Sequence, residues 1–369
     1  MYTDRQNKII AYLDQQEFDG IILNAGPSLT YFTGLHFHLS ERPVVCVIAA
    51  GSAPLLILPE LEQAKLEHCS FALNPFSYPD DPARWPDVFK QAFAHLGATD
   101  KRFGIEPRQL RMLESSLISQ AAGDISFAEA DDAIATCRTI KDASEIEKME
   151  RAVAIAQDSL QATLPVITEG ITEQEIAAEL VIQLLRHRSE PNLPFSPIVA
   201  AGPNGANPHA QPSERVLQNG DLLIIDWGAS WQGYTSDLTR TFAIGPVSDN
   251  AKEIHSLVYR ANEAGRKAAA PGIACLEVDR AARAVITDGG YGPEFRHRTG
   301  HGLGMECHEE PYIHDANTQL LEAGMTFTVE PGIYLQGTHG VRIEDDVVIT
   351  PDGSRSLSDI SRELICIKF

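Results

Sequence analysis

The chain has 369 residues, a hydrophobic content of 43% and a formal net charge of -21 at pH 7. This length allows about two domains. The acidic charge argues against nucleic acid or an anionic membrane as a partner. The six cysteines show no paired spacing, which favours reduced thiols over a disulfide framework. Because the opening residues also lack a hydrophobic signal core, we expect a soluble, cytoplasmic protein.

The first third of the chain predicts a small α/β domain. Short apolar runs at residues 21–24, 44–50 and 55–58 are typical of buried strands, and helical stretches lie between them. We place the boundary near Cys137, so that residues 1–136 form an N-terminal domain and residues 137–369 a larger C-terminal one.

The C-terminal part opens with two predicted helices that share a start signal. Ser144 with Glu147 is expected to form a capping box, and Thr172 with Glu175 another. Apolar residues follow both boxes at helical spacing, and strand-like stretches come next.

The rest of the chain repeats that order. Helical patterns cover residues 250–270 and 276–286, and strands are predicted at residues 325–330 and 340–350. The prediction is therefore an α+β domain built from two similar halves, each with two helices followed by strands.

Five side chains in this part are candidates for binding metal. Asp226 closes the apolar run 222–225, which is typical of a buried strand, and a lone carboxylate there would cost several kcal/mol without a cationic partner. The other candidates are Asp237, His301, Glu330 and Glu344. Four carboxylates with one imidazole suit two hard divalent ions, which together can generate hydroxide from water and polarise a carbonyl or phosphoryl oxygen. Oxygen ligands favour manganese, with cobalt or zinc as alternatives.

Each acid taken alone has an ordinary explanation, because most Asp and Glu residues lie on solvated surfaces. Their arrangement favours a site instead. Asp226 and Asp237 stand at the ends of two successive strand-like segments, and Glu330 and Glu344 do the same about a hundred residues later. Each predicted half thus supplies a pair of acids.

Several separated motifs, agreeing in order and spacing, resemble the pita-bread metallopeptidases. They are DWGASWQGYTSDLTRTF, HRTGHGLGMECHEEP, TVEPGIY and GVRIEDD. Within that family they resemble the proline-handling branch of Xaa-Pro aminopeptidases and Xaa-Pro dipeptidases, or prolidases. YFTG at residues 31–34 resembles the creatinase-like N-terminal domain of the same family. The resemblance implies a pita-bread catalytic domain with a pseudo-twofold repeat, after a smaller α/β domain.

The resemblance also implies a role for each candidate ligand. Asp226 would bind one metal, Asp237 and Glu344 would bridge the pair, and His301 and Glu330 would bind the second metal. Glu330 would also take the proton from the attacking water.

Other residues would surround these ligands. His209, His297 and His308 match histidines that contact substrate in the family, with surface or capping roles as the alternative. His209 and His308 would contact the scissile carbonyl or the leaving nitrogen. Arg342 lies two residues before Glu344, so on a strand both would project to one face, where a guanidinium can orient an acid. Cys307 stands where the family usually has an aliphatic residue, and we expect it to behave as a small apolar side chain rather than a nucleophile.

The expected substrates are short proline-containing peptides, cleaved before proline. A dipeptidase must hold the free C-terminal carboxylate, which suits a fixed arginine, yet residues 302–329 contain no Lys or Arg. This tilts the prediction slightly towards an aminopeptidase, although Arg296, Arg298, Arg342 or a residue of the N-terminal domain could serve.

Other functions stay open. Alternatives on the same dimetal site are an organophosphate hydrolase, an ectoine-type hydrolase or a methionine aminopeptidase, and a non-catalytic binding protein is a third class. Family members are often homodimers, and we expect the same here.

Overall fold

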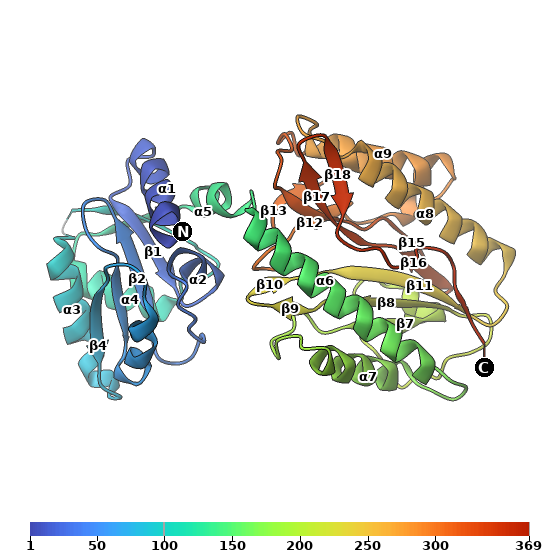
Figure 1. Ribbon diagram of the computed structural model, residues 1–369, viewed down its shortest axis with the longest axis horizontal. Coiled ribbons are helices and arrows are strands. Elements are labelled where there is room, and N and C mark those ends of the chain that lie inside the picture. Colours follow the sequence, from blue (N-terminus) through green and yellow to red (C-terminus); the bar gives the residue numbers. More distant parts are fainter. Residues whose placement is uncertain (99, 369) are drawn as a thin grey trace. The chain divides into compact units, whose positions relative to one another are not determined.

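The computed structural model describes residues 1–98 and 100–368. The chain divides into two compact units, Met1–Arg138 and Thr139–Phe369, called here the N-terminal and C-terminal units (Figure 1). No helix in the described ranges is long and apolar enough to cross a membrane.

The N-terminal unit is a six-stranded mixed sheet with helices around it. The strand order is β4-β3-β2-β1-β5-β6, in which β1 pairs antiparallel with β2 and parallel with β5. The strands are β1 (Gly20–Asn24), β2 (Val45–Ala49), β3 (Leu55–Pro59), β4 (Asn74–Tyr78), β5 (Arg102–Ile105) and β6 (Ser126–Glu129). The helices are α1 (Tyr2–Gln15), α2 (Pro27–Thr33), α3 (Trp85–Leu96), α4 (Met112–Ala122) and α5 (Asp131–Arg138). The three strands predicted from apolar runs are confirmed as β1, β2 and β3.

The C-terminal unit contains two larger sheets and four long helices. One sheet has the order β19-β11-β8-β7, and the other β13-β12-β14-β17-β18. The first comprises β7 (Ile198–Ala201), β8 (Leu222–Trp227), β11 (Leu238–Ile244) and β19 (Cys366–Ile367). The second comprises β12 (Gly300–Gly302), β13 (Glu309–Ile313), β14 (Thr326–Val329), β17 (Asp345–Thr350) and β18 (Gly353–Ser356). Two short hairpins join β9 (Ser230–Trp231) to β10 (Tyr234–Thr235), and β15 (Gly332–Leu335) to β16 (His339–Arg342).

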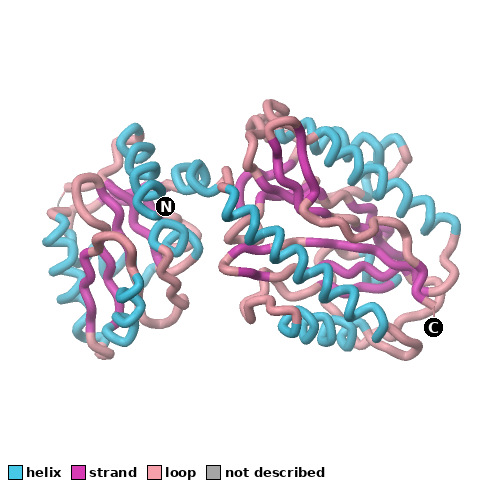
Figure 2. The backbone as a smooth tube through the Cα atoms, viewed as in Figure 1, coloured by secondary structure: helices cyan, strands magenta, loops and turns pink. Residues whose placement is uncertain are grey.

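The four helices repeat the predicted order of two helices before strands. They are α6 (Ala143–Thr163), α7 (Glu173–Arg186), α8 (Asp249–Ala268) and α9 (Cys275–Asp288). Figure 2 shows these helices on the outside of the unit, with the strands between them. The strand predicted at residues 340–350 is interrupted at Ile343 and Glu344, where the chain passes from β16 to β17.

The start of α6 corrects one prediction. Its capping box is formed by Asp142 and Glu145, not by Ser144 and Glu147. Asp142 Oδ1 accepts from the Glu145 amide at 2.9 Å, and Glu145 Oε2 accepts from the Asp142 amide at 2.8 Å. Asp is at least as good an N-cap as Ser and stands two residues earlier, so it takes the cap and leaves Ser144 inside the first turn. The box of Thr172 and Glu175 at α7 is confirmed.

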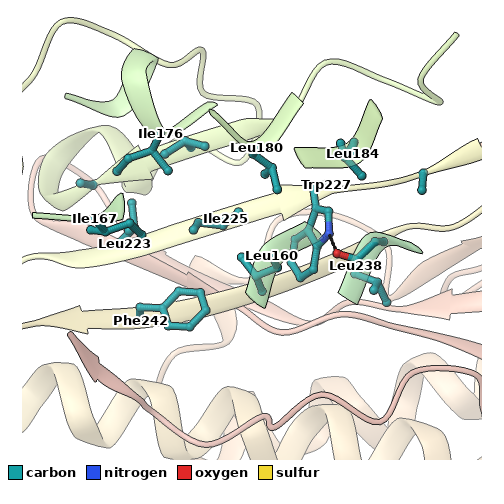
Figure 3. Close-up of a cluster of buried hydrophobic side chains, with 14 of the residues drawn as sticks. Leu160, Ile167, Ile176, Leu180, Leu184, Leu223, Ile225, Trp227, Leu238 and Phe242 are labelled. Atoms are coloured by element: carbon teal, nitrogen blue, oxygen red, sulfur yellow. Dashed lines mark hydrogen bonds between the residues drawn. The ribbon is translucent and has the colours of Figure 1, made fainter. Parts of the chain in front are cut away.

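Strand β8 positions Asp226 by simple alternation. Leu223, Ile225 and Trp227 point into the core shared with α6 and α7 (Figure 3). Trp227 is anchored there, because its Nε1 donates to the carbonyl of Ala156 at 2.8 Å. Side chains alternate between the two faces of a strand, so Asp226 is turned to the face opposite this apolar core. The hydrophobic pattern of β8 thereby directs a carboxylate away from α6 and α7.

Candidate metal centre

One backbone bridge brings together the acids of the two halves. Glu344 donates its amide to the carbonyl of Thr239 at 3.1 Å, and Thr239 Oγ1 donates to Glu344 Oε2 at 2.6 Å. Thr239 is also the partner of Asp226 in the pairing of β11 with β8. The contact therefore places Glu344, from the second half, beside the strands that carry the aspartates of the first half.

The five predicted ligands lie in two overlapping groups. Asp226, Asp237 and Glu344 each offer an oxygen within 4.8 Å of the others, and His301, Glu330 and Glu344 form a second such set. Glu344 belongs to both. Asp237 also approaches the second set, since its Oδ2 lies 3.6 Å from His301 Nε2. This arrangement has the geometry of two neighbouring cation sites with shared carboxylates.

The carboxylates are buried close to one another, and that is electrostatically costly. Burial raises the pKa of Asp237 well above its usual value, and the charges of Asp226 and Asp346 raise it further. Burial does the same to the pKa of Glu344, with Asp237 and Glu330 adding to the effect. Like charges in a poorly solvated place cannot all ionise unless a cation joins them. The positively charged side chains near the cluster are too few to neutralise it. The cluster is therefore suited to binding an added cation.

Glu330 has a different setting within the cluster. Its side chain is 15% exposed, against 11% for Asp226 and 7% for Asp237. Glu330 Oε1 lies 3.5 Å from His301 Nε2, and its Oε2 lies 3.9 Å from His297 Nδ1. Burial raises the pKa of Glu330 to about 7, although the nearby Arg342 opposes the shift. Glu330 is thus the carboxylate of the four that faces the solvent side of the cluster.

The cluster fits hard divalent cations. Asp226 Oδ1 is fully buried and has no hydrogen-bond partner among the described residues, whereas its Oδ2 accepts from Arg342. An unpaired buried carboxylate oxygen costs free energy, and a cation at that position would satisfy it. Carboxylate oxygens with one imidazole nitrogen are the donor types that manganese, cobalt or zinc take in proteins. The residues therefore fit a pair of such ions.

Arg342 orients an acid, as predicted, but mainly a different one. Its Nη2 donates to Asp226 Oδ2 at 2.5 Å, whereas Glu344 is reached only through Thr239, whose Oγ1 accepts from Arg342 Nε at 3.2 Å. Arg342 as a residue is 3% exposed. Alternation along a strand puts Arg342 and Glu344 on one face, yet the chain leaves regular strand geometry between them. The bond of Arg342 joins the β15–β16 hairpin to Asp226 on β8 in the four-stranded sheet.

His297 lies beside the cluster and is held by two hydrogen bonds. Its Nε2 is 2.9 Å from Tyr334 Oη, and its Nδ1 is 2.8 Å from the carbonyl of Arg298. Tyr334 Oη also accepts from Arg342 Nη1 at 2.8 Å. Burial lowers the pKa of His297 to about 3, and the positive charge of Arg342 adds to this. A neutral imidazole with a set orientation is the result.

The two remaining predicted histidines are exposed. The ring of His308 meets that of His301 edge to face, with centroids 4.0 Å apart, and His308 can join Asp237 and His301 as a third possible ligand group. His209 is exposed in the segment before β8. Burial raises the pKa of Asp226, and the charge of His209 is among the smaller effects that oppose this rise. Both histidines are therefore open to solvent, and His308 is the one in contact with a ligand residue.

Four residues at the site were not predicted as part of it. Thr239 and Tyr334 position Glu344, His297 and Arg342 through the bonds described above. Asp346 Oδ2 accepts from the Asp237 amide at 3.1 Å, and Asp346 stands two residues after Glu344. Cys307 is more than an apolar filler, since its thiol donates to Asp237 Oδ2 at 3.1 Å. The two aspartates that follow Glu344 in the sequence could have indicated Asp346. The roles of Thr239 and Tyr334 could not be predicted, because they depend on pairing between distant strands.

Comparisons with known proteins identify the family of this chain. Residues 147–351 match the family model described as metallopeptidase family M24, and residues 5–140 match the creatinase/prolidase N-terminal domain. A Pyrococcus horikoshii protein named Xaa-Pro dipeptidase is 34% identical over 98% of this chain and 99% of its own length. The crystal structure of a dipeptidase from the same organism superposes with a TM-score of 0.92, at 37% identity over 98% of this chain and 99% of that one. An X-Pro aminopeptidase from Thermotoga maritima gives a TM-score of 0.85, at 32% identity over 98% and 99%.

These matches bear on the predicted fold and enzyme class. The N-terminal creatinase-type domain and the pita-bread catalytic domain are confirmed, and so is the hydrolase class. Both domain models lie on one chain that its relatives match along nearly their full length. The protein therefore belongs to metallopeptidase family M24 and carries the creatinase/prolidase N-terminal domain.

Proposed function

We propose that this metallopeptidase is an Xaa-Pro dipeptidase, which hydrolyses the bond before a C-terminal proline. One observation carries the proposal. All five predicted ligands gather around the shared Glu344, in a chain that is similar along its whole length to a protein named Xaa-Pro dipeptidase. The names of the relatives favour a dipeptidase, against the slight tilt towards an aminopeptidase that the absence of Lys and Arg from residues 302–329 indicated.

We further propose that two divalent ions, with manganese the first choice, occupy the cluster. Asp226, Asp237 and Glu344 would hold one, and His301, Glu330 and Glu344, approached by Asp237, would hold the other. When bound, such a pair lowers the pKa of water and polarises the carbonyl under attack. The unpaired Asp226 Oδ1 supports this assignment, because the described protein groups leave that oxygen without a partner.

The side chains around the ligands would divide the remaining work. Glu330 is the most accessible carboxylate and is placed to accept the proton of the attacking water. His308 and His209, which are both exposed, can contact the scissile carbonyl and donate a proton towards the leaving proline nitrogen. Arg342 and Tyr334 keep Asp226 and His297 in place. A homodimer is proposed as the working form, by analogy with the family.

Substrate selection tests the proposal. Protein purified, stripped with a chelator and resupplied with manganese should cleave an Xaa-Pro dipeptide faster than the same peptide extended or amidated at its C-terminus. A preference for the extended peptide would make the protein an aminopeptidase, which its likeness to the Thermotoga maritima enzyme supports as second candidate. Cleavage of no proline peptide would remove both. If chelation leaves activity untouched, an exchangeable metal centre is wrong.

A further inference from the structure

Arg298 is a half-buried cation at the edge of the site without an acidic partner. It lies between His297 and the strand β12. Among the described residues, no carboxylate oxygen comes within salt-bridge distance of its guanidinium, and no side-chain hydrogen bond from it is found. Neighbouring buried cations do have such partners: Arg342 binds Asp226, and Lys141 binds Glu309. A half-buried arginine without an acid can bind an anion that arrives from outside.

Tyr312 holds this guanidinium in place. The central carbon of the Arg298 guanidinium lies 4.4 Å from the centroid of the Tyr312 ring, on the neighbouring strand β13. The two strands are joined there by the Thr299 amide, which donates to the carbonyl of Ile313 at 2.9 Å. A guanidinium that rests on an aromatic ring keeps its N–H groups free for a carboxylate and loses little entropy when it binds one.

The same pair of strands carries the imidazoles of the site. His301 on β12 and His308, next to β13, meet edge to face, and the Arg298–Tyr312 contact joins the same two segments of the chain. The charge of Arg298 is felt there, because burial lowers the pKa of His308 and Arg298 lowers it further. Burial raises the pKa of Glu330, and the charges of Arg342 and Arg298 both oppose that rise.

The required span is short. In an Xaa-Pro dipeptide, three bonds join the scissile carbonyl carbon to the carboxylate carbon of proline, a distance of at most about 4 Å. An anchor for that carboxylate must therefore lie within side-chain reach of the imidazoles. Two other arginines are less suited, since Arg342 is buried and committed to Asp226, and the exposed Arg296 reaches back to the carbonyl of Pro293.

We propose that Arg298, supported by Tyr312, binds the C-terminal carboxylate of the dipeptide substrate and so selects dipeptides over longer peptides. This inference rests on the proposed function. It supplies from the segment before β12 the cation that residues 302–329 lack. A bidentate arginine–carboxylate pair also sets the orientation of the proline ring, and thereby of the scissile bond.

The test compares a dipeptide with its amide in matched variants. Arg298→Gln should lower kcat/KM for alanyl-proline by about 10- to 100-fold, the worth of a hydrogen bond to a charged group, mostly through KM. For alanyl-prolinamide, which lacks the carboxylate, wild type and variant should be equal. Arg298→Lys should recover part of the loss. Arg296→Gln changes the same charge two residues away and should behave as wild type. Tyr312→Leu should weaken dipeptide binding less than Arg298→Gln does.

The outcomes separate this inference from the proposed function. An equal loss on dipeptide and amide, or no loss on either, overturns Arg298 as the anchor while the dipeptidase stands. Cleavage of neither substrate by wild type overturns the dipeptidase and the anchor together. Metal content and thermal melting of each variant show whether it is folded and loaded, and free proline should inhibit wild type more strongly than Arg298→Gln, which is a readout without turnover of a peptide.

Discussion

Glu344 and Asp345 are adjacent, both are buried, and their charges are treated in opposite ways. Arg240 and Arg362 bind Asp345 directly, at 2.8 Å and 2.6 Å, and Ser358 donates to it as well. Despite its burial, these partners hold the pKa of Asp345 below its usual value. Glu344 faces other carboxylates instead, and burial together with those charges raises its pKa. Asp345 is bound directly by two arginines, whereas the single arginine near Glu344, Arg342, bonds to Asp226 instead.

The difference shows how a structural charge differs from a functional one. Around Asp345 the chain supplies its own cations, so the ionised group stabilises the fold. Around Glu344 the chain supplies Thr239 as a hydrogen-bond donor, but too few positive charges for the neighbouring acids. The unsatisfied negative charge is what would hold metal, at some expense to the metal-free protein.

The largest expected effect lies on the Glu344 side. Asp237→Ala and Glu344→Ala should each abolish turnover and remove at least one metal ion per chain, because both residues would bridge the pair of ions. Elemental analysis and peptide hydrolysis measure this. Full occupancy with retained turnover in these variants would falsify the dimetal assignment. In the presence of a chelator, Glu344→Gln should be as stable as wild type or more so, since it relieves repulsion among buried acids.

His308 tests where the metal-binding face ends. We expect His308→Ala to lower kcat by roughly 10²- to 10⁴-fold, the range for loss of a general acid or base, with metal content and melting temperature close to wild type. Metal loss would instead place His308 among the ligands, in its group with Asp237 and His301. A lower melting temperature with normal turnover per folded molecule would point to a structural role.

On the Asp345 side we expect a change in stability that does not depend on metal. Asp345→Asn should lower the free energy of unfolding by about 3–5 kcal/mol, because Arg240 and Arg362 would remain buried without their acid. Denaturant unfolding with and without chelator should give the same difference. A loss that disappears in chelator contradicts the contrast drawn here. Arg355→Gln, which breaks the exposed pair with Glu150, is the control and should cost less than about 1 kcal/mol.

The smallest expected effect concerns His255 on α8 and is a change in stability with pH. This buried side chain avoids an unpaired charge by staying neutral. Burial lowers its pKa from 6.5 to about 4, and Nε2 has no partner among the described residues. The unfolded chain therefore takes up a proton below about pH 6.5 that the folded chain refuses, so stability falls as pH falls towards 4. At 1.36 kcal/mol per pKa unit, the loss by about pH 5 is roughly 2 kcal/mol. His255→Leu should flatten the unfolding free energy over this range, and an unchanged slope would contradict the prediction.

The sequence alone was sufficient to predict features that depend on residues close together in the chain. Alternation and helical spacing identified β1 to β3, α8 and α9, and the capping box at Thr172, because short-range geometry decides these features. The motif resemblance nominated Asp226, Asp237, His301, Glu330 and Glu344, since donor type and spacing carry over within a family. Local signals failed where two start signals competed, as at Asp142 and Ser144.

Only the tertiary structure decided which residues meet. That Arg342 binds Asp226, that Thr239 orients Glu344, and that Arg298 rests on Tyr312 all depend on how distant strands pair. The register between strands is determined by packing over a whole sheet, and a shift by one residue would turn every side chain to the other face. The sequence thus indicates which residues can bind metal. The hydrogen-bond partners of these residues, and the lack of an acidic partner for Arg298 among the described residues, are determined only by the folded sheets.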